Sequence, residues 1–126
     1  MKLRFLFIAH AVISLVFGIV AILFPTQFIG AYGGKIDDVG IVLTRIIGGM
    51  LIGYSAVSWF VRNAPASETR RGVVMGYMIS FAVLTVVYIV GALGPAGTSQ
   101  DWFNVVLALL FTLGYGYYAF LKPNSD

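Results

Sequence analysis

The sequence contains no cysteine and only one histidine, His10. Without cysteine the chain forms no disulfide, no thiolate nucleophile, no iron–sulfur cluster and no cysteine-based metal site. Cysteine usage therefore gives no indication of the redox compartment. A single histidine is too few for a typical zinc site, so we expect no metal and no cofactor within one chain.

Charge is also scarce, because only 10% of the residues are charged and 60% are hydrophobic. Ordinary soluble domains have roughly a quarter of their residues charged. A soluble protein this apolar would lack a polar surface, so the composition predicts a membrane protein. The net charge of +3 is spread over segment ends and forms no basic face, so we expect no nucleic-acid partner.

The long apolar runs contain no carboxylate. Proton-coupled transporters usually need an acid inside the membrane, and cation pathways usually need acidic rings. The sequence also has no recognisable nucleophile–base pair, phosphate-binding loop or metal motif. We therefore do not expect an enzyme.

Four apolar runs of about twenty residues dominate the chain, a length that matches a hydrocarbon core of about 30 Å. Strand-like alternation is absent, and the runs are too long and too few for a membrane barrel. The pattern predicts an all-α fold, a transmembrane four-helix bundle formed by a single domain over residues 1–126. The expected helices cover about residues 5–24, 39–62, 68–93 and 101–121.

The first run has a basic start like that of a signal peptide, but it is nearer in length to a spanning helix and offers no small-residue cleavage site. We expect a retained helix that ends at Pro25, followed by a glycine-rich loop over residues 30–34. The other expected helix ends are an N-cap at Asp37 or Asp38, an N-cap at Ser67, a capping box from Thr98 to Asp101, and a short polar tail over residues 122–126.

The positions of lysine and arginine predict the orientation in the membrane. Two of them, Lys35 and Arg45, lie on one side of the bundle. The other six lie on the opposite side: Lys2, Arg4, Arg62, Arg70, Arg71 and Lys122. We therefore expect an up-down-up-down topology with both termini in the cytoplasm. The localisation that follows is a multi-pass protein of the cell (inner, cytoplasmic) membrane.

Each predicted helix carries a stripe of small or polar residues at four-residue spacing. In lipid, helices associate through close backbone approach and interhelical hydrogen bonds. One interpretation is that the stripes pack against one another, through Gly18, Gly49, Gly53, Gly72, Gly76, Ala108 and Gly116. The alternative is that they line a cavity, and the candidate ligand-contacting or polar interior residues are Arg45, His10, Asn104, Thr112, Ser14, Ser80, Tyr54 and Tyr88.

Arg45 lies about two turns inside the second predicted helix, where an unpaired charge is costly. Three interpretations remain open. Its side chain can extend to the outer phosphates, or pair inside the bundle with a nearby aspartate or Asn104. It can also form an anion or headgroup site, since the arginine fork fits such ligands.

His10 lies at a similar depth from the opposite end. The simplest interpretation is a histidine hydrogen-bonded to Ser58, Tyr115 or Tyr118, because buried polar groups find partners. The alternatives are a proton-relay or quinone-contacting role, and haem ligation by the His10 residues of two chains.

The layout also carries a family resemblance. It rests on a first helix that ends in Phe24-Pro25, a glycine-rich outer loop, the sequence Arg45-Ile46-Ile47-Gly48-Gly49, and the basic inner turn with Arg62, Arg70 and Arg71. This arrangement resembles the small four-helix bacterial membrane proteins grouped as DoxX-like, together with related uncharacterised families. The resemblance implies membrane redox chemistry, including quinone-linked sulfur oxidation. We transfer no functional residue from it, because this chain has no cysteine and one histidine.

Packing surfaces are what the residues encode most directly. We therefore expect a non-enzymatic multi-pass membrane protein, an accessory or oligomer-forming subunit whose partners are the lipid bilayer and its own copies or a larger membrane complex. A second hypothesis is a small oligomeric transporter or channel for an anionic, uncharged or lipid-like molecule that uses Arg45 and the polar stripe. A third is a quinone-linked redox subunit with His10 as its acid–base residue.

Overall fold

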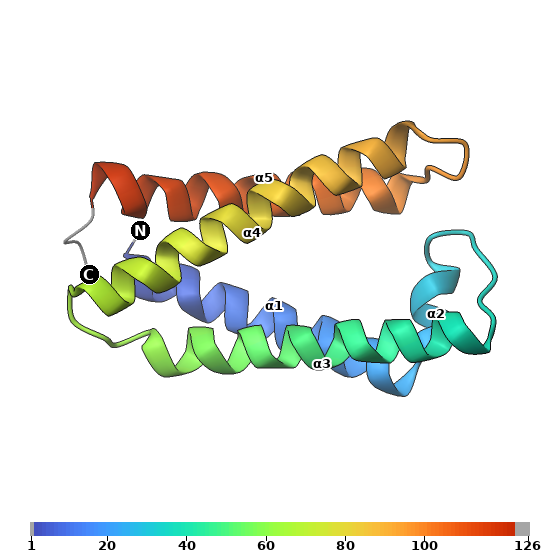
Figure 1. The fold of residues 1–126 in the computed structure, drawn as a ribbon, viewed down its shortest axis with the longest axis horizontal. Helices are drawn as coiled ribbons and strands as arrows, with labels where there is room; N and C mark the ends of the chain where they lie inside the picture. Colours follow the sequence, from blue (N-terminus) through green and yellow to red (C-terminus); the bar gives the residue numbers. More distant parts are fainter. Residues whose placement is uncertain (1, 123–126) are drawn as a thin grey trace.

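The computed structural model describes residues 2–122, and every regular element in that range is helical (Figure 1). The elements are α1 (Leu3–Leu23), α2 (Pro25–Gly30), α3 (Asp38–Val61), α4 (Glu68–Leu93), α5 (Ser99–Gly116) and the short π-helix η1 (Tyr117–Leu121). Four helices are long and apolar enough to cross a membrane: α1, α3, α4, and α5 together with η1. The predicted class, an all-helical membrane protein with four spans, agrees with this structure.

The long helices begin and end within two residues of the predicted bounds, and η1 completes the fourth predicted run. The short helix α2 was not predicted, and it fills the stretch between Pro25 and the predicted loop, which starts after Gly30. Pro25 ends α1, as expected, but it also takes the first position of α2. That position suits proline, because its fixed φ is helical and its missing N–H would have no partner there.

The predicted caps are confirmed. Asp37 caps α3 by accepting a hydrogen bond of 2.8 Å from the backbone N–H of Gly40. Ser67 caps α4 by accepting one of 3.1 Å from the N–H of Arg70, and Thr98 forms the capping box of α5 with Asp101. Of the predicted polar tail, residues 123–126 lie outside the described range.

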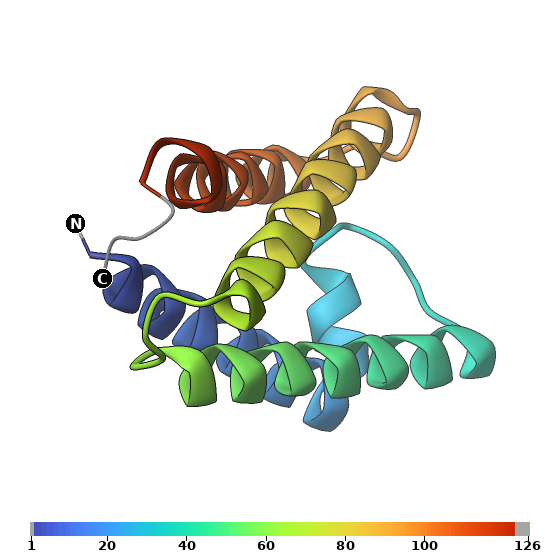
Figure 2. The ribbon, with the colours of Figure 1, turned by 60° about the vertical axis from the view of Figure 1, so that its left-hand side comes forward.

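The four long helices form two antiparallel hairpins, α1 with α3 and α4 with α5 (Figures 1 and 2). In the first hairpin the register is set by close backbone contact between Gly18 and Gly48. A Cβ atom on Gly18 would lie 2.8 Å from the carbonyl oxygen of Gly48, so only glycine permits this approach. About two turns away along both helices, the Ser55 hydroxyl donates to the Ala11 carbonyl at 2.6 Å.

The two hairpins approach each other at the end of the molecule where α1 begins and η1 ends, the closed end, and they diverge toward the end that carries α2, the open end (Figures 1 and 2). The shared core lies at the closed end and consists of Leu3, Leu6, Phe7, Val74, Tyr77, Phe111, Tyr115, Tyr118 and Ala119. Burial of these aromatic and aliphatic groups therefore holds the hairpins together at one end.

Within the chain, the structure buries the predicted packing residues of α1 and α5 more than those of α3 and α4. Gly18 and Ala108 are buried, and Gly116 is half-buried against Met78. The other four predicted packing glycines are exposed, and a Cβ atom would meet nothing within 4 Å at Gly49, Gly53, Gly72 and Gly76.

On α3 the face buried within the chain is offset by one residue from the predicted glycines. Its buried positions are Thr44, Gly48, Ser55 and Ser58, and one residue corresponds to about 100° around a helix. Gly49 and Gly53 therefore point away from α1. On α4 the chain buries bulkier side chains, Val74 and Tyr77, in place of the glycines.

Candidate functional site

The closed end of the molecule holds a buried polar cluster centred on His10. The His10 ring is 2% exposed, Ser58 and Tyr115 are 0% exposed, and the ring's Nδ1 lies 2.8 Å from the Tyr115 hydroxyl and 3.1 Å from the Ser58 hydroxyl. These contacts join α1 to α5 and to α3. The expectation that His10 hydrogen-bonds to Ser58 or Tyr115 is therefore confirmed, whereas Tyr118 packs its ring on Tyr117 instead.

The cluster continues from Ser58 to a fourth helix. Ser58 donates to the Tyr77 hydroxyl at 3.0 Å, and Tyr77 donates to the backbone carbonyl of Tyr54 at 3.0 Å. Because the carbonyl can only accept, the direction of both bonds is fixed. With hydrogen on Nδ1, His10 donates to the Ser58 hydroxyl, and the bonds then run from α1 through α3 to α4; the contact of the same Nδ1 with Tyr115 adds α5.

Aromatic rings enclose His10 on several sides. Ring centroids lie 4.5 Å away at Tyr77, 4.9 Å at Phe81, 5.3 Å at Phe111 and 5.7 Å at Tyr115. Haem ligation between two chains would need an exposed ring, and this ring is enclosed by its own chain. The haem interpretation of His10 is therefore wrong for the bundle as it stands.

The contact between Ser58 and His10 resembles a nucleophile–base pair, which the sequence does not reveal because the two residues are 48 positions apart. The geometry does not favour catalysis, because the Ser58 hydrogen is directed to Tyr77 and not to the imidazole. Ser58 is also fully buried. The cluster is therefore arranged to hold helices together.

Arg45 lies on α3 and is exposed. Its Nε donates to the carbonyl oxygen of Ile22 at 3.1 Å. That carbonyl belongs to the last turn of α1, where carbonyls lack partners within the helix and a positive charge is favourable. One of the three interpretations, an ion pair or hydrogen bond with an aspartate or with Asn104, is not found within the described residues 2–122.

Asn104 forms a second polar contact, at the open end. Its amide donates to the hydroxyl of Tyr32 in the loop after α2, and it accepts from Gln100 at 3.5 Å. Burial raises the pKa of the Tyr32 hydroxyl above its ordinary value. This contact links α5 of one hairpin to the loop of the other.

The remaining candidates do not converge on one site. Thr112 donates to the Ala108 carbonyl of its own helix at 2.8 Å. Ser14 is buried on α1, Ser80 and Tyr88 are half-buried on α4, and Tyr54 is at the surface of α3. The predicted polar stripe is therefore divided between the His10 cluster, the Asn104 contact and isolated positions.

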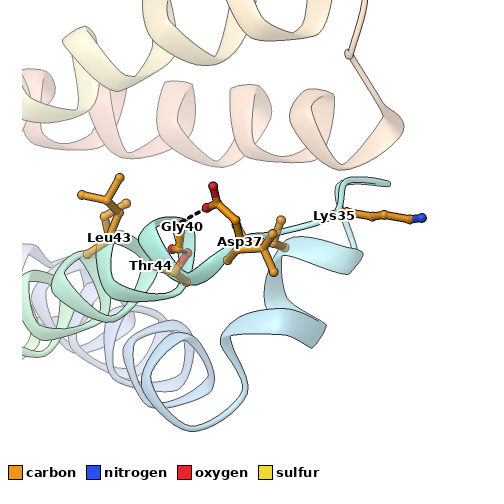
Figure 3. Close-up of a pocket in the computed structure, with 8 residues that line it drawn as sticks. Lys35, Asp37, Gly40, Leu43 and Thr44 are labelled. Atoms are coloured by element: carbon orange, nitrogen blue, oxygen red, sulfur yellow. Dashed lines mark hydrogen bonds between the residues drawn. The ribbon is translucent and has the colours of Figure 1, made fainter.

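A cavity of about 590 Å³ lies at the open end, beside the start of α3 (Figure 3). Figure 3 shows Asp37 bonded to Gly40 at its mouth, while the Lys35 side chain points away. Half of its eight lining residues are aliphatic: Ile29, Ile36, Leu43 and Ile47. None of the eight predicted polar candidates lines this cavity, so the cavity interpretation of the stripe gains no support from it.

The sequence model of one protein family, described as a domain of unknown function (DUF8292), matches residues 8–124. The chain belongs to this family. The DUF8292 match includes all of α3, α4 and α5 and every member of the His10 cluster. No curated protein and no solved structure matches the chain.

Proposed function

We propose that this chain is a non-enzymatic membrane subunit that associates with its own copies or with a larger membrane complex through the outer face of α3. The observation that carries this proposal is the exposed pair Gly49 and Gly53, where an added Cβ atom would meet nothing within 4 Å. The two glycines stand four residues apart on one helical face, turned away from α1. Small residues at this spacing let two helix backbones approach closely in lipid.

The distribution of burial supports the same proposal. Only 17% of the α3 span and 17% of the α4 span is buried inside the chain, against 39% of each of the other two spans. The outer faces of α3 and α4 are therefore available to lipid or to another protein. Within the chain, contact between Gly18 and Gly48 is an example of the packing that we expect between chains.

The proposal includes the orientation and location expected from the sequence. The chain crosses the cell (inner) membrane in an up-down-up-down arrangement with both termini in the cytoplasm, because most lysines and arginines lie at that end. We propose that this chain resembles DoxX-like proteins in its four-helix architecture and in nothing further. The enclosed His10 ring does not favour a quinone-linked role.

The test is the oligomeric size of the protein in mild detergent, measured by native mass spectrometry. The double variant Gly49→Leu, Gly53→Leu fills the proposed contact face, and we expect it to release monomer or to lose its partner. Ile47→Phe serves as the control, since it enlarges an exposed side chain on another face of α3, two residues before Gly49. If the double variant keeps the size of the native assembly, the proposal is wrong.

A second candidate function is a small oligomeric transporter or channel for an anionic, uncharged or lipid-like molecule. The observation that favours it is the exposed side chain of Arg45, whose Nε donates a hydrogen bond to the Ile22 carbonyl. An exposed arginine inside an apolar segment can attract an anion across a subunit interface. Flux through liposomes that stays unchanged in Arg45→Ala would exclude this function.

A further inference from the structure

A second cavity, of about 250 Å³, lies at the closed end, where the start of α1 meets the turn between α3 and α4. Four basic residues line it: Lys2, Arg4, Arg62 and Arg70. None of the described residues that line it is acidic. The cavity therefore concentrates positive charge from three separate parts of the chain.

Two of its guanidinium groups are held in place. The Arg62 guanidinium carbon lies 3.7 Å from the centre of the Trp59 ring, and Arg62 also donates to the Trp59 carbonyl. Arg70 is only 4% exposed and donates to the Ala64 carbonyl at 3.2 Å. Arginines fixed in this way lose little side-chain entropy when a ligand binds, and their fork matches the oxygen atoms of a phosphate group.

The start of α1 adds to the positive potential. Its N-cap, Lys2, makes no capping hydrogen bond with its side chain, and the first turn contains no acidic residue. The first backbone N–H groups of a helix lack partners within it and favour a negatively charged ligand. The helix end and the arginine side chains thus attract the same kind of group.

The surroundings of the cavity are apolar on the membrane side. Leu3 and Phe7, both buried, form its inner wall, and the exposed Phe5 borders it. Trp59, which holds Arg62, stands near the end of a span, where tryptophan prefers the level of the headgroups. The basic cavity therefore lies where the polar headgroups of a bilayer meet its acyl chains.

We propose that this cavity binds the phosphate group of an anionic membrane lipid. The guanidinium groups of Arg4 and Arg62 and the start of α1 contact the phosphate, and the acyl chains lie along the apolar surface next to Phe5. Basic pockets between membrane helices are known to hold anionic headgroups. This inference does not depend on the assembly proposed above.

The experiment is lipid binding by the full chain in a neutral detergent, measured by native mass spectrometry. Phosphatidylglycerol is compared with phosphatidylcholine that has the same acyl chains. We expect phosphatidylglycerol to bind more tightly, and the double variant Arg4→Gln, Arg62→Gln to reduce its affinity about twenty-five-fold, from about fivefold for each charge near the surface. The affinity for phosphatidylcholine should change less than twofold.

The matched control is Arg71→Gln. Arg71 is exposed at the start of the same helix as Arg70 but does not line the cavity. We expect its removal to change phosphatidylglycerol binding less than twofold. An equal loss in Arg71→Gln and in the double variant would show a diffuse surface effect and overturn the proposal, as would unchanged binding in the double variant.

Two further arms keep the test decisive. The variant Arg4→Lys, Arg62→Lys retains both charges. It should keep most of the affinity for phosphatidylglycerol if the glutamine variant binds weakly because it lacks the charges and not because it misfolds. Titration with inorganic phosphate, measured by calorimetry in the absence of lipid, separates the two sources of the phosphate group. Phosphate should bind more weakly than the lipid, and tighter binding of free phosphate would overturn the assignment to a lipid.

Discussion

Nδ1 of His10 on α1 lies 2.8 Å from the hydroxyl of Tyr115 on α5, and this hydrogen bond joins the two hairpins of the molecule. The two hairpins share few close backbone contacts, so side chains carry their association. A buried polar pair is stabilising only when both members find partners. The lone histidine and a tyrosine 105 positions away therefore satisfy each other.

Removing the Tyr115 hydroxyl should weaken the association of the hairpins. Tyr115→Phe keeps the ring and its contacts with Phe7 and Phe111, but it deletes one buried hydrogen bond. We expect the free energy of unfolding in detergent to fall by about 0.5–1.5 kcal/mol. The measurement is titration with a denaturing detergent, followed by tryptophan fluorescence.

Tyr117→Phe is the control for this change, because Tyr117 follows shortly after in the same segment and is exposed. We expect its free energy of unfolding to equal that of the unaltered chain. Equal losses in Tyr115→Phe and Tyr117→Phe would contradict the role given to the bond between His10 and Tyr115.

The neighbouring residues Gly48 and Gly49 should respond in opposite ways to alanine. A Cβ atom on Gly48 would lie 2.8 Å from the carbonyl oxygen of Gly18, whereas one on Gly49 would meet nothing within 4 Å. Gly48→Ala therefore forces α1 and α3 apart, and overpacking of this kind typically costs about 1–3 kcal/mol. Gly49→Ala should be neutral or slightly stabilising, since alanine favours a helix more than glycine does.

The comparison is made by unfolding both variants in the same detergent system. We expect Gly48→Ala to have the lower free energy of unfolding and Gly49→Ala to match or exceed the unaltered chain. A Gly48→Ala variant as stable as Gly49→Ala would show that α1 and α3 can separate without loss, and that their close contact is not needed.

The sequence was sufficient to predict the helices, because their length, apolar composition and caps are local properties. Asp37, Ser67 and Thr98 each cap a helix by contacts within three residues, and proximity in the chain makes such contacts predictable. The sequence also limited the hydrogen-bond partners of His10 to a few hydroxyl groups. A buried imidazole needs a hydroxyl at a similar depth, and few were available.

The packing faces of α3 and α4 were not predictable from spacing alone. On α3 both Gly48 and Gly49 belong to a four-residue pattern, and only the position of α1 determines which one is buried. The chain of bonds from Ser58 to Tyr77 depends on the relative placement of two helices, which the pattern within each helix does not contain. Likewise, the pattern of residues does not show that Pro25, which ends α1, also starts the short helix α2.

The N-cap of α3 is expected to contribute to local stability at the open end. Asp37→Ala removes the acceptor for the N–H of Gly40, and loss of such a cap costs about 0.5–2 kcal/mol. We expect faster hydrogen exchange at the Gly40 amide, measured by mass spectrometry of short peptides. Asp38→Ala is the control, because Asp38 stands in the first turn and affects the helix only through its charge. Equal exchange in both variants would contradict the assignment of the cap to Asp37.

Tyr32 should ionise at a higher pH than an ordinary tyrosine. Burial disfavours the phenolate and raises the pKa of this hydroxyl above 10.0, an effect larger than that of the hydrogen bond from Asn104, which lowers it. In the unfolded chain the group ionises near its ordinary pKa, so the stability contributed by Tyr32 is complete below that pH. It is lost as the pH rises through the raised pKa, because the folded protein keeps a proton that the unfolded chain has released.

The measurement is the difference in phenolate absorbance between the unaltered chain and Tyr32→Phe during a pH titration, which isolates Tyr32 from the other tyrosines. We expect a midpoint above pH 10.0, and a smaller loss of unfolding free energy in Tyr32→Phe than in the unaltered chain over the same alkaline range. A midpoint at or below the ordinary pKa would mean that the Tyr32 hydroxyl reaches water. The contact between the loop after α2 and α5 would then be open in solution, and the two hairpins would be joined only at the His10 end.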